Sequence, residues 1–352
     1  MAISRRGFLG GMLGTAGALL VGGRAYGESE AAPLTADWRP AYAQLEEQGR
    51  FEERVEQARS MLEECKLCPR RCGVNRLRGE TGVCRSTDKA VVYAYQPHFG
   101  EEIPLVGRHG SGTIFFSNCN LRCVFCQNWP IAHEGRGSQF DDQRLAEMML
   151  NVQRMGCHNV NLVTPTHVMP SILRATRIAA RNGLRIPLCY NTGGYDSLEA
   201  IRLLDGIVDI YLPDLKFMDG AQAARYAGAA TDYPQTAKRA IAEMHRQVGE
   251  LVTDERGVAM RGLMIRHLVM PNRVAGTREF VHWVADALST STYVNIMSQY
   301  RVEHRAFEYP QIARAIRTEE FLEAMDWAEQ AGLTNLDQRS VMQREVFRRR
   351  LG

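Results

Sequence analysis

The sequence predicts an α/β protein built on a parallel sheet. A partial barrel of six β/α units fits best, and an open doubly wound sheet is the alternative. Six apolar runs rich in Val, Ile, Leu and Tyr alternate with segments of helical periodicity, as in parallel strands joined by helical crossovers. The chain of 352 residues is 45% hydrophobic and 24% charged, which suffices for a large core. Its 43 basic and 40 acidic residues give a net charge of +3, so no nucleic-acid surface is expected.

Residues 1–27 resemble a twin-arginine export signal. Arg5 and Arg6 precede an uncharged run over 7–23, and Ala25 and Gly27 are small residues suited to a cleavage site. The run is shorter than the ~20 residues that a membrane-spanning helix needs, so no stable membrane insertion is expected. The sequence therefore predicts a periplasmic protein, or a cytoplasmic one if the leader is not used.

Residues 28–60 are expected to form a polar linker and an N-terminal helix, and residues 61–110 a cysteine-rich segment. That segment contains "CKLCPRRCGVNRLRGETGVC", with thiols at Cys65, Cys68, Cys72 and Cys84. Four thiols within a short stretch meet the ligand count of a closed zinc site or an iron–sulfur cluster. Two disulfides are the alternative in an exported protein, but the short C-x2-C spacing favours a metal.

The barrel is expected over residues 111–335, and a C-terminal tail over 336–352. Its predicted strands are 112–118, 159–166, 186–193, 206–216, 262–271 and 292–300. The apolar residues of 237–248 and 280–288 recur at helical spacing and predict helices between strands. The basic stretch "REVFRRRLG" at the end of the tail predicts a solvated last helix.

Polar residues recur where the predicted strands end. The carboxyl ends of parallel strands share one edge of a sheet, which is where chemistry is placed in such folds. These residues, in strand order, are Cys119, Thr164, Thr166, His167, Asn191, Thr192, Asp214, Lys216, Asn272, Gln299 and Tyr300. A role as a turn or cap residue is equally expected for Asn272 and for Asp219.

Three cysteines follow the first predicted strand in C-x3-C-x2-C spacing, at Cys119, Cys123 and Cys126. A redox pair would leave Cys119 unexplained, and a structural zinc site would lack a fourth ligand, for which His133 is the nearest candidate. Three thiolates on one loop can instead hold three irons of a 4Fe–4S cluster and leave the fourth iron open. Cys157 and Cys189 adjoin or lie within apolar strands and are expected to be small core residues.

The triad, with Phe125 before its last cysteine, resembles the loop of the radical S-adenosylmethionine superfamily. The segments "CQN", "YNTGGYDS", "DIYLPDLKFMD" and "RHLVMPN" are similar, in this order over about residues 61–333, to pyruvate formate-lyase activating enzymes and their uncharacterised homologues. The resemblance implies a partial (β/α)6 radical S-adenosylmethionine barrel with a small cysteine-rich N-terminal segment. It also implies a 4Fe–4S cluster on the triad, whose open iron binds the amino and carboxylate groups of S-adenosylmethionine.

The same resemblance implies that Asn191, Thr192, Asp214 and Lys216 face S-adenosylmethionine or the hydrogen-abstraction site. The superfamily's Gly-Gly-Glu-like stretch after strand two is replaced by "VTPTHVMP", where Thr164 and Thr166 would supply polar contacts. The implied reaction is cleavage of S-adenosylmethionine by one electron from a low-potential donor, which gives a 5′-deoxyadenosyl radical for hydrogen abstraction.

The family-level expectation for the substrate is a glycyl-radical enzyme. Cysteine segments like that of residues 61–110 occur in homologues and suggest an auxiliary iron–sulfur cluster or zinc. Two other functions remain open: a non-catalytic iron–sulfur electron carrier or sensor, and a zinc-stapled thiol oxidoreductase.

Overall fold

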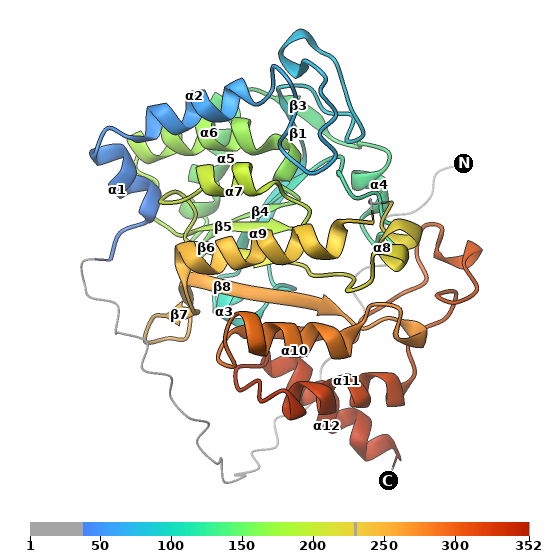
Figure 1. Ribbon diagram of the computed structural model, residues 1–352. Coiled ribbons are helices and arrows are strands. Elements are labelled where there is room, and N and C mark those ends of the chain that lie inside the picture. Colours follow the sequence, from blue (N-terminus) through green and yellow to red (C-terminus); the bar gives the residue numbers. More distant parts are fainter. Residues whose placement is uncertain (1–37, 229–230, 352) are drawn as a thin grey trace, which may run out of the picture. The chain divides into compact units, whose positions relative to one another are not determined.

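Six parallel strands form the centre of the sheet in the computed structural model, which describes residues 38–228 and 231–351 (Figure 1). They are β2 (Ser111–Phe116), β4 (Val160–Val163), β5 (Leu188–Thr192), β6 (Ile210–Pro213), β8 (Ala259–Leu268) and β9 (Tyr293–Met297). Each pairs in parallel with the next in this order, so all six predicted strands form. The arrangement is the predicted α/β fold, a partial barrel. The expected export signal of residues 1–27 lies outside the described residues.

Three antiparallel strands, which the sequence pattern did not predict, extend this sheet. They are β1 (Ala90–His98), beside β2; β3 (Ser138–Phe140), beside β1; and β7 (Val252–Thr253), beside β8. Most of β1 is half-buried or exposed, as in a strand covered on one face only, so it lacks the continuous apolar run that marks the central strands. It also belongs to the segment expected to be only a cysteine-rich unit.

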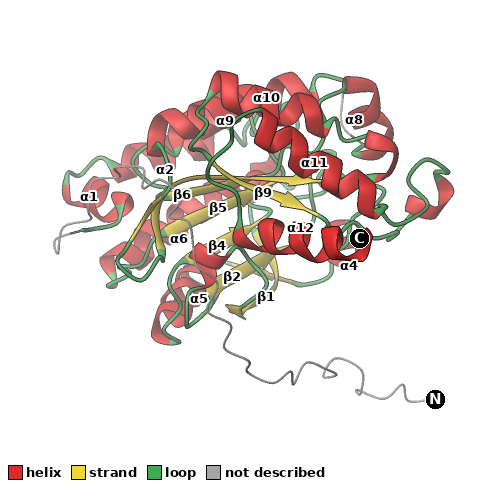
Figure 2. Cartoon of the chain, turned by 90° about the horizontal axis from the view of Figure 1, so that it is seen from below, coloured by secondary structure: helices red, strands yellow, loops and turns green. Residues whose placement is uncertain are grey.

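Helices surround the sheet in Figure 2. They are α1 (Ala41–Glu47), α2 (Phe51–Ser60), α3 (Ile103–Val106), α4 (Trp129–Ala132), α5 (Asp142–Arg154), α6 (Met169–Arg181), α7 (Leu198–Leu203), α8 (Gly220–Tyr226), α9 (Tyr233–Val248), α10 (Thr277–Ala287), α11 (Thr318–Gln330) and α12 (Gln338–Leu351). The two predicted helices correspond to α9 and α10. Within the described ranges, no helix combines the length and the apolar character needed to cross a bilayer.

A helix was expected within residues 28–60 and forms as α2, whereas α1 lies where a polar linker was expected. Helix α1 is packed against the domain, because the Tyr42 ring is fully buried and its hydroxyl donates to the Ile186 carbonyl at 2.8 Å. The Ala41 amide donates to Asp209 Oδ1 at 2.8 Å, which ties the start of α1 to the start of β6. Two turns of helix among Gln and Glu residues give too short an apolar pattern to reveal this packing. At the other end, α12 is the predicted last helix.

The inner face of the barrel changes from apolar to polar along the strands. A small apolar cluster, the barrel floor, lies on this face and consists of Leu105, Cys189, Ile210, Leu212, Ala259, Met264 and Tyr293. Side chains two positions apart share a face of a strand. The next inward positions, toward the carboxyl ends, are therefore polar: Asn191, Asp214, Arg266 and Asn295. The alternation itself places this polar set in one layer above the barrel floor.

Candidate active site

The loop after β2 carries the three cysteines of the triad. Asn118 and Arg122 adopt positive φ angles of 72° and 55°, which turn the chain sharply on both sides of Cys119. The loop is fixed from outside, since the Asn118 amide donates to the Ile131 carbonyl at 3.0 Å and the Val124 amide to the Tyr226 carbonyl at 2.8 Å. This cluster loop therefore has a defined conformation against α4 and α8.

A cavity of about 260 Å³ lies between the cluster loop and the carboxyl ends of the strands. The five strands β4, β5, β6, β8 and β9 contribute a residue at or just beyond their ends. The lining includes all three triad cysteines and the predicted residues Thr164, Asn191, Thr192, Asp214, Lys216 and Gln299. The structure thus brings most of the predicted strand-end residues together with the three thiols.

A charged network connects three strand ends at this cavity. The Asp214 carboxylate accepts from Lys216 Nζ at 2.6 Å and from Arg266 Nε at 2.8 Å. Arg266 Nη2 also donates to Asn191 Oδ1 at 2.6 Å, which fixes the orientation of that amide. Gly194 lets the loop after β5 lie close to the backbone of Asp214. Its φ is +78°, and a Cβ there would lie 2.4 Å from the Asp214 carbonyl oxygen.

The network holds its members in their ionised forms. Burial alone would raise the pKa of Asp214, but Arg266 and Lys216 hold it below its ordinary value. Burial likewise disfavours the charged form of Lys216, yet Asp214 keeps the pKa of the ammonium group above its usual range. The site therefore presents a carboxylate neutralised by two cations rather than a free acid or base.

Thr166 and Thr192 point toward another part of the fold. Thr192 Oγ1 donates to Asp196 Oδ2 at 2.6 Å and lies 3.1 Å from Thr166 Oγ1, while Tyr190 donates to Asp196 Oδ1 at 3.0 Å. Asp196 is fully buried, so these hydroxyls satisfy its oxygens. Thr192 still lines the cavity, whereas Thr166 does not. Thr164 does line it, in a left-handed conformation with φ of +63° that is rare for a β-branched residue.

The other predicted strand-end residues are used elsewhere. Asn272 donates to the Gln311 carbonyl at 2.6 Å, and the buried Tyr300 hydroxyl donates to the Ile312 carbonyl at 2.7 Å. Asp219 caps α8 by accepting from the Gln222 amide at 2.8 Å. His133 lies 3.1 Å from the Cys123 carbonyl oxygen through Nε2.

The cluster loop offers thiols that can bind a metal and a cationic donor that can bind an anion. Burial raises the pKa of all three triad thiols, and Cys119 and Cys126 each raise that of Cys123 further, which places the three within electrostatic reach. Arg122 also lines the cavity, and its Nη1 is buried with no hydrogen-bond partner among residues 38–228 and 231–351. A donor of this kind is available to an anionic ligand.

The four upstream cysteines line a separate, very small cavity beside the cluster loop, the upstream cysteine site. His167 and Asn120 complete its wall, and His167 Nδ1 is buried without a partner in the described part of the chain. Arg76, only 2% exposed, ties this segment to the barrel by donating to the His167 carbonyl at 2.7 Å. His167 thus lies at the upstream cysteine site and not at the cavity beside the cluster loop.

All nine cysteines of the chain lie in the described ranges, and none forms a disulfide. No three His, Cys, Asp or Glu side chains of those ranges already surround a point that could hold a single metal ion. Cys157 and Cys189 are buried core residues.

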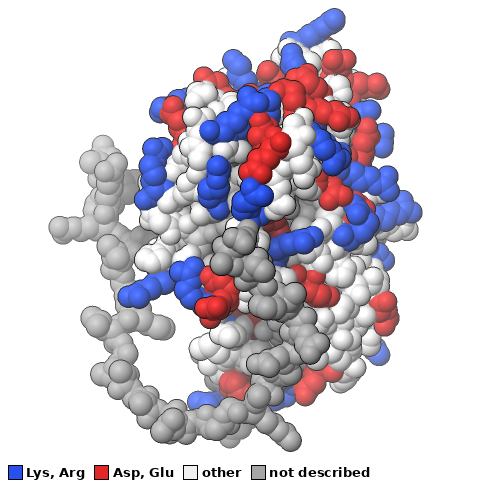
Figure 3. Space-filling view, turned by 90° about the vertical axis from the view of Figure 1, so that its left-hand side faces the viewer, with Lys and Arg blue, Asp and Glu red and all other residues white. Residues whose placement is uncertain are grey.

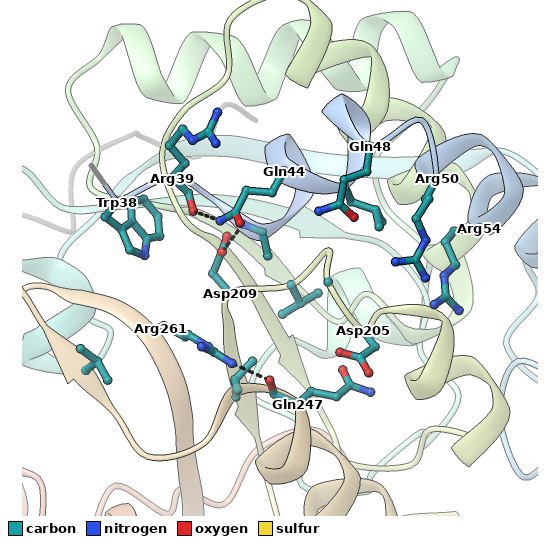
Figure 4. A pocket seen from close by; sticks show the side chains of 16 residues that line it. Trp38, Arg39, Gln44, Gln48, Arg50, Arg54, Asp205, Asp209, Gln247 and Arg261 are labelled. Carbon is teal, nitrogen blue, oxygen red and sulfur yellow. Dashed lines mark hydrogen bonds between the residues drawn. The ribbon is translucent and has the colours of Figure 1, made fainter. Parts of the chain in front are cut away.

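A larger cavity, of about 760 Å³, lies at the opposite end of the strands (Figure 4). Some of its polar groups are engaged with one another: Asp209 accepts from the Ala41 amide, and Arg261 donates to the Gln247 carbonyl at 2.8 Å. Figure 3 shows that end of the unit, where Lys and Arg side chains are interspersed with Asp and Glu. No cysteine of the described chain lines this larger cavity, whereas all three triad cysteines line the smaller one.

Sequence reasoning missed Arg266, the residue that joins Asp214 to Asn191. The signal was present, because an arginine stands within the run "GLMIRHLVMP" of a strand predicted to be buried on both faces. A charge in such a strand is rarely tolerated unless it is paired, so it indicates a partner inside the barrel.

A model of the radical SAM superfamily matches residues 113–255. The chain belongs to this superfamily. It is 34% identical over 290 residues to the uncharacterized protein MJ0674 of Methanocaldococcus jannaschii, with 80% of this chain and 78% of that protein covered. The crystal structure of methylornithine synthase is 13% identical, with a TM-score of 0.40 over 64% of this chain and 69% of that one, a likeness too distant to inform the function.

Membership implies a 4Fe–4S cluster and S-adenosylmethionine, and the residues present fit both. Cys119, Cys123 and Cys126 would hold the cluster, since thiolates are its usual ligands. When bound, the pair supplies a 5′-deoxyadenosyl radical as the agent of hydrogen abstraction. Asn191, Arg266 and Lys216 line the same cavity and would be the protein's own groups for orienting the reactants there.

Proposed function

We propose that this radical SAM enzyme abstracts hydrogen from a substrate that enters the open side of the barrel. The carrying observation is that the three triad thiols share one cavity with Asn191, Asp214, Lys216 and Arg266, which come from three neighbouring strands. A non-catalytic electron carrier needs the thiols but not a buried network of charged side chains beside them.

The inward residues suit the recognition of S-adenosylmethionine, which carries an amino group, a carboxylate and a ribose. Lys216, and Arg122 with its unpartnered Nη1, offer donors to the carboxylate. Thr164, in its left-handed conformation, closes the cavity where the superfamily's Gly-Gly-Glu-like stretch would be expected. Among these residues, Arg122 was not expected from the sequence to contact S-adenosylmethionine.

The narrower proposal is that the substrate is a glycyl-radical enzyme and that a low-potential protein donates the electron. Support comes from the "DLK" and "NTG" segments, which resemble those of activating enzymes and here form the network at Asp214, Lys216 and Asn191. Fold and cofactor do not determine a substrate, so this rests on the resemblance. The test is a glycyl-radical electron paramagnetic resonance signal in a candidate partner after incubation with the reduced enzyme.

We also propose that Cys65, Cys68, Cys72 and Cys84 hold an auxiliary iron–sulfur cluster or a zinc ion. Their common cavity, together with the unpartnered His167 Nδ1, supports a bound group. Iron, sulfide and zinc contents of Cys84→Ala identify the group, because this variant should lose only what the upstream site holds. Metal contents equal to those of the unmodified protein would contradict the proposal.

The central experiment is anaerobic reconstitution, followed by S-adenosylmethionine, a strong reductant and an assay for 5′-deoxyadenosine. Wild type should form it, and Cys126→Ala should not. The matched control is Cys157→Ala, which removes a buried thiol outside both cysteine sites. Failure of wild type to form 5′-deoxyadenosine with a reducible cluster on the triad would refute the proposed function.

A further inference from the structure

A second polar cavity of about 250 Å³ adjoins the main one inside the barrel. Three side chains, Arg266, Met297 and Gln299, line both cavities and form the wall between them. The far side of the second cavity is made by the turn of residues 100–102, which precedes α3, and by the first turns of α12. A molecule in this cavity would therefore be next to the reaction site without displacing the cluster loop.

Two buried carboxylates face this cavity. Glu101 is 9% exposed, and its Oε2 lies 3.4 Å from Arg266 Nη1. Glu102 is only 3% exposed; its Oε1 accepts from Asn295 Nδ2 at 2.8 Å, while its Oε2 has no hydrogen-bond partner within the described ranges. A buried carboxylate oxygen without a donor is costly, so the geometry calls for a donor from outside the chain.

The charges around the wall do not balance. The buried acids Glu101, Glu102 and Asp214 face two buried bases, Arg266 and Lys216. His98 lies 3.8 Å from Glu101, but burial lowers the pKa of its ring, which keeps the imidazole neutral.

Arg339, at the edge of the cavity, acts on Glu101 through its charge but makes no direct contact with either carboxylate. Its guanidinium donates to the carbonyls of Gly100 and Phe99, at 2.9 and 3.3 Å, and forms no ion pair in the described part of the chain. Within the described ranges, Glu102 is therefore the buried carboxylate that no cation contacts directly.

We propose that the second cavity is the substrate chamber and that it binds a cationic group of the substrate, a guanidinium or an ammonium, at Glu102 Oε2. This inference rests on the proposed function, because the proposed function makes the cavity beside the cluster loop the source of the hydrogen-abstracting radical. Burial raises the pKa of Glu101 and of Glu102, and a bound cation stabilises their ionised forms.

The size of the chamber limits what can enter. A water molecule takes about 30 Å³, so the space corresponds to roughly eight waters, or to one long side chain or a small amine. Met297, which shares a face of β9 with Asn295, supplies apolar contact for a carbon stem, and Asn295 and Gln343 offer polar groups around it. This pattern, an apolar stem with one charged end, is that of an arginine- or lysine-like substrate.

The test compares matched charged and neutral probes on the reconstituted holoenzyme with S-adenosylmethionine, by anaerobic titration calorimetry. Butylguanidinium is compared with butylurea, and acetyl-glycyl-arginine amide with acetyl-glycyl-citrulline amide, so that each pair differs chiefly in charge. The cation should bind about tenfold tighter or more, as expected for a hydrogen bond to a charged group. The tighter of the two cations distinguishes a free small molecule from a peptide.

Glu102→Gln should abolish the preference, because the amide still accepts from Asn295 but carries no charge. Glu345→Gln, an exposed change on α12, is the control and should keep it. Equal affinity of the charged and neutral probes for wild type would overturn the inference, and this comparison does not depend on the folding of any variant. So would a preference that survives in a folded Glu102→Gln protein.

The two proposals fail separately. Formation of 5′-deoxyadenosine by wild type without any probe tests hydrogen-abstraction chemistry alone. If it forms while charged and neutral probes bind alike, the chamber inference is wrong and the proposed function stands. If the cations bind selectively but no 5′-deoxyadenosine is made, the proposed function is wrong, and the cavity is a cation site without the role of a substrate chamber.

Discussion

Replacement of Asp214 by Asn tests the network that joins three strand ends. The carboxylate is largely buried and accepts two short hydrogen bonds from cations, Lys216 and Arg266. The amide is isosteric but neutral, so both cations remain buried, and the only carboxylate of the described ranges left within ion-pair distance of Arg266 is that of Glu101 at 3.4 Å. Removal of one partner from a buried ion pair costs about 3–5 kcal/mol, so Asp214→Asn should lower the unfolding free energy by about this amount. The corresponding fall in melting temperature for a chain of 352 residues is roughly 4–7 °C.

The assay is urea unfolding at neutral pH, followed by circular dichroism, for Asp214→Asn, Lys216→Met and the double variant. Lys216→Met removes one of the two cations that Asp214→Asn leaves without their carboxylate. The losses of unfolding free energy from the two changes should therefore differ from additivity by about 0.5–3 kcal/mol. The cations hold the pKa of Asp214 below its unfolded value of about 4. Its stabilisation is therefore present above that pH and lost as the pH falls through the folded pKa, so the effect of Asp214→Asn should shrink in acid. A loss below about 1 kcal/mol at neutral pH, or strict additivity, would refute the reasoning.

Three further outcomes are expected. Burial raises the pKa of Glu102, so the stability linked to it is present below its unfolded pKa and lost as the pH rises through the folded one. Glu102→Gln should therefore flatten the loss of unfolding free energy as the pH rises above the unfolded pKa, and equal slopes would count against this. Thr166→Val removes a hydroxyl from the buried Asp196 group and should cost about 1–3 kcal/mol of stability in urea unfolding without changing the dissociation constant for S-adenosylmethionine; weaker binding with unchanged stability would be the contrary result. The pair Arg5→Lys and Arg6→Lys should keep the protein in the cytoplasm on fractionation, and an unchanged periplasmic fraction would show that the leader does not direct export.

Strands that are buried on both faces could be predicted because they leave continuous apolar runs. Strand β1 could not, since its residues mix exposed and half-buried positions and its place is set by pairing with β2. The packing of Tyr42 against Ile186 depends on a contact 144 residues away, which a local pattern does not reveal.

The site residues were predicted from their position at strand ends. The errors arose because that position does not say which face of the strand a side chain occupies. Asn191 and Thr192 are neighbours and were expected to act together, yet side chains alternate, so one points inward and the other toward Asp196. The same alternation would have placed Arg266 inward, two positions beyond Met264 on the barrel floor. The position of His167 beside the upstream cysteines depends on tertiary contacts, including the one from Arg76.

That contact of Arg76 also has a consequence for synthesis on the ribosome. Its partner, the His167 carbonyl, lies 91 residues later in the chain. At translation rates of 5–20 residues per second, the cysteine-rich segment waits about 5–18 seconds for the barrel strand that completes its wall. During this interval its four thiols are open to solvent and to oxidants, and the segment cannot take its final shape first although it is made first. The barrel is thus the template for the N-terminal segment, and damage to the end of β4 should disorder cysteines that were translated long before it.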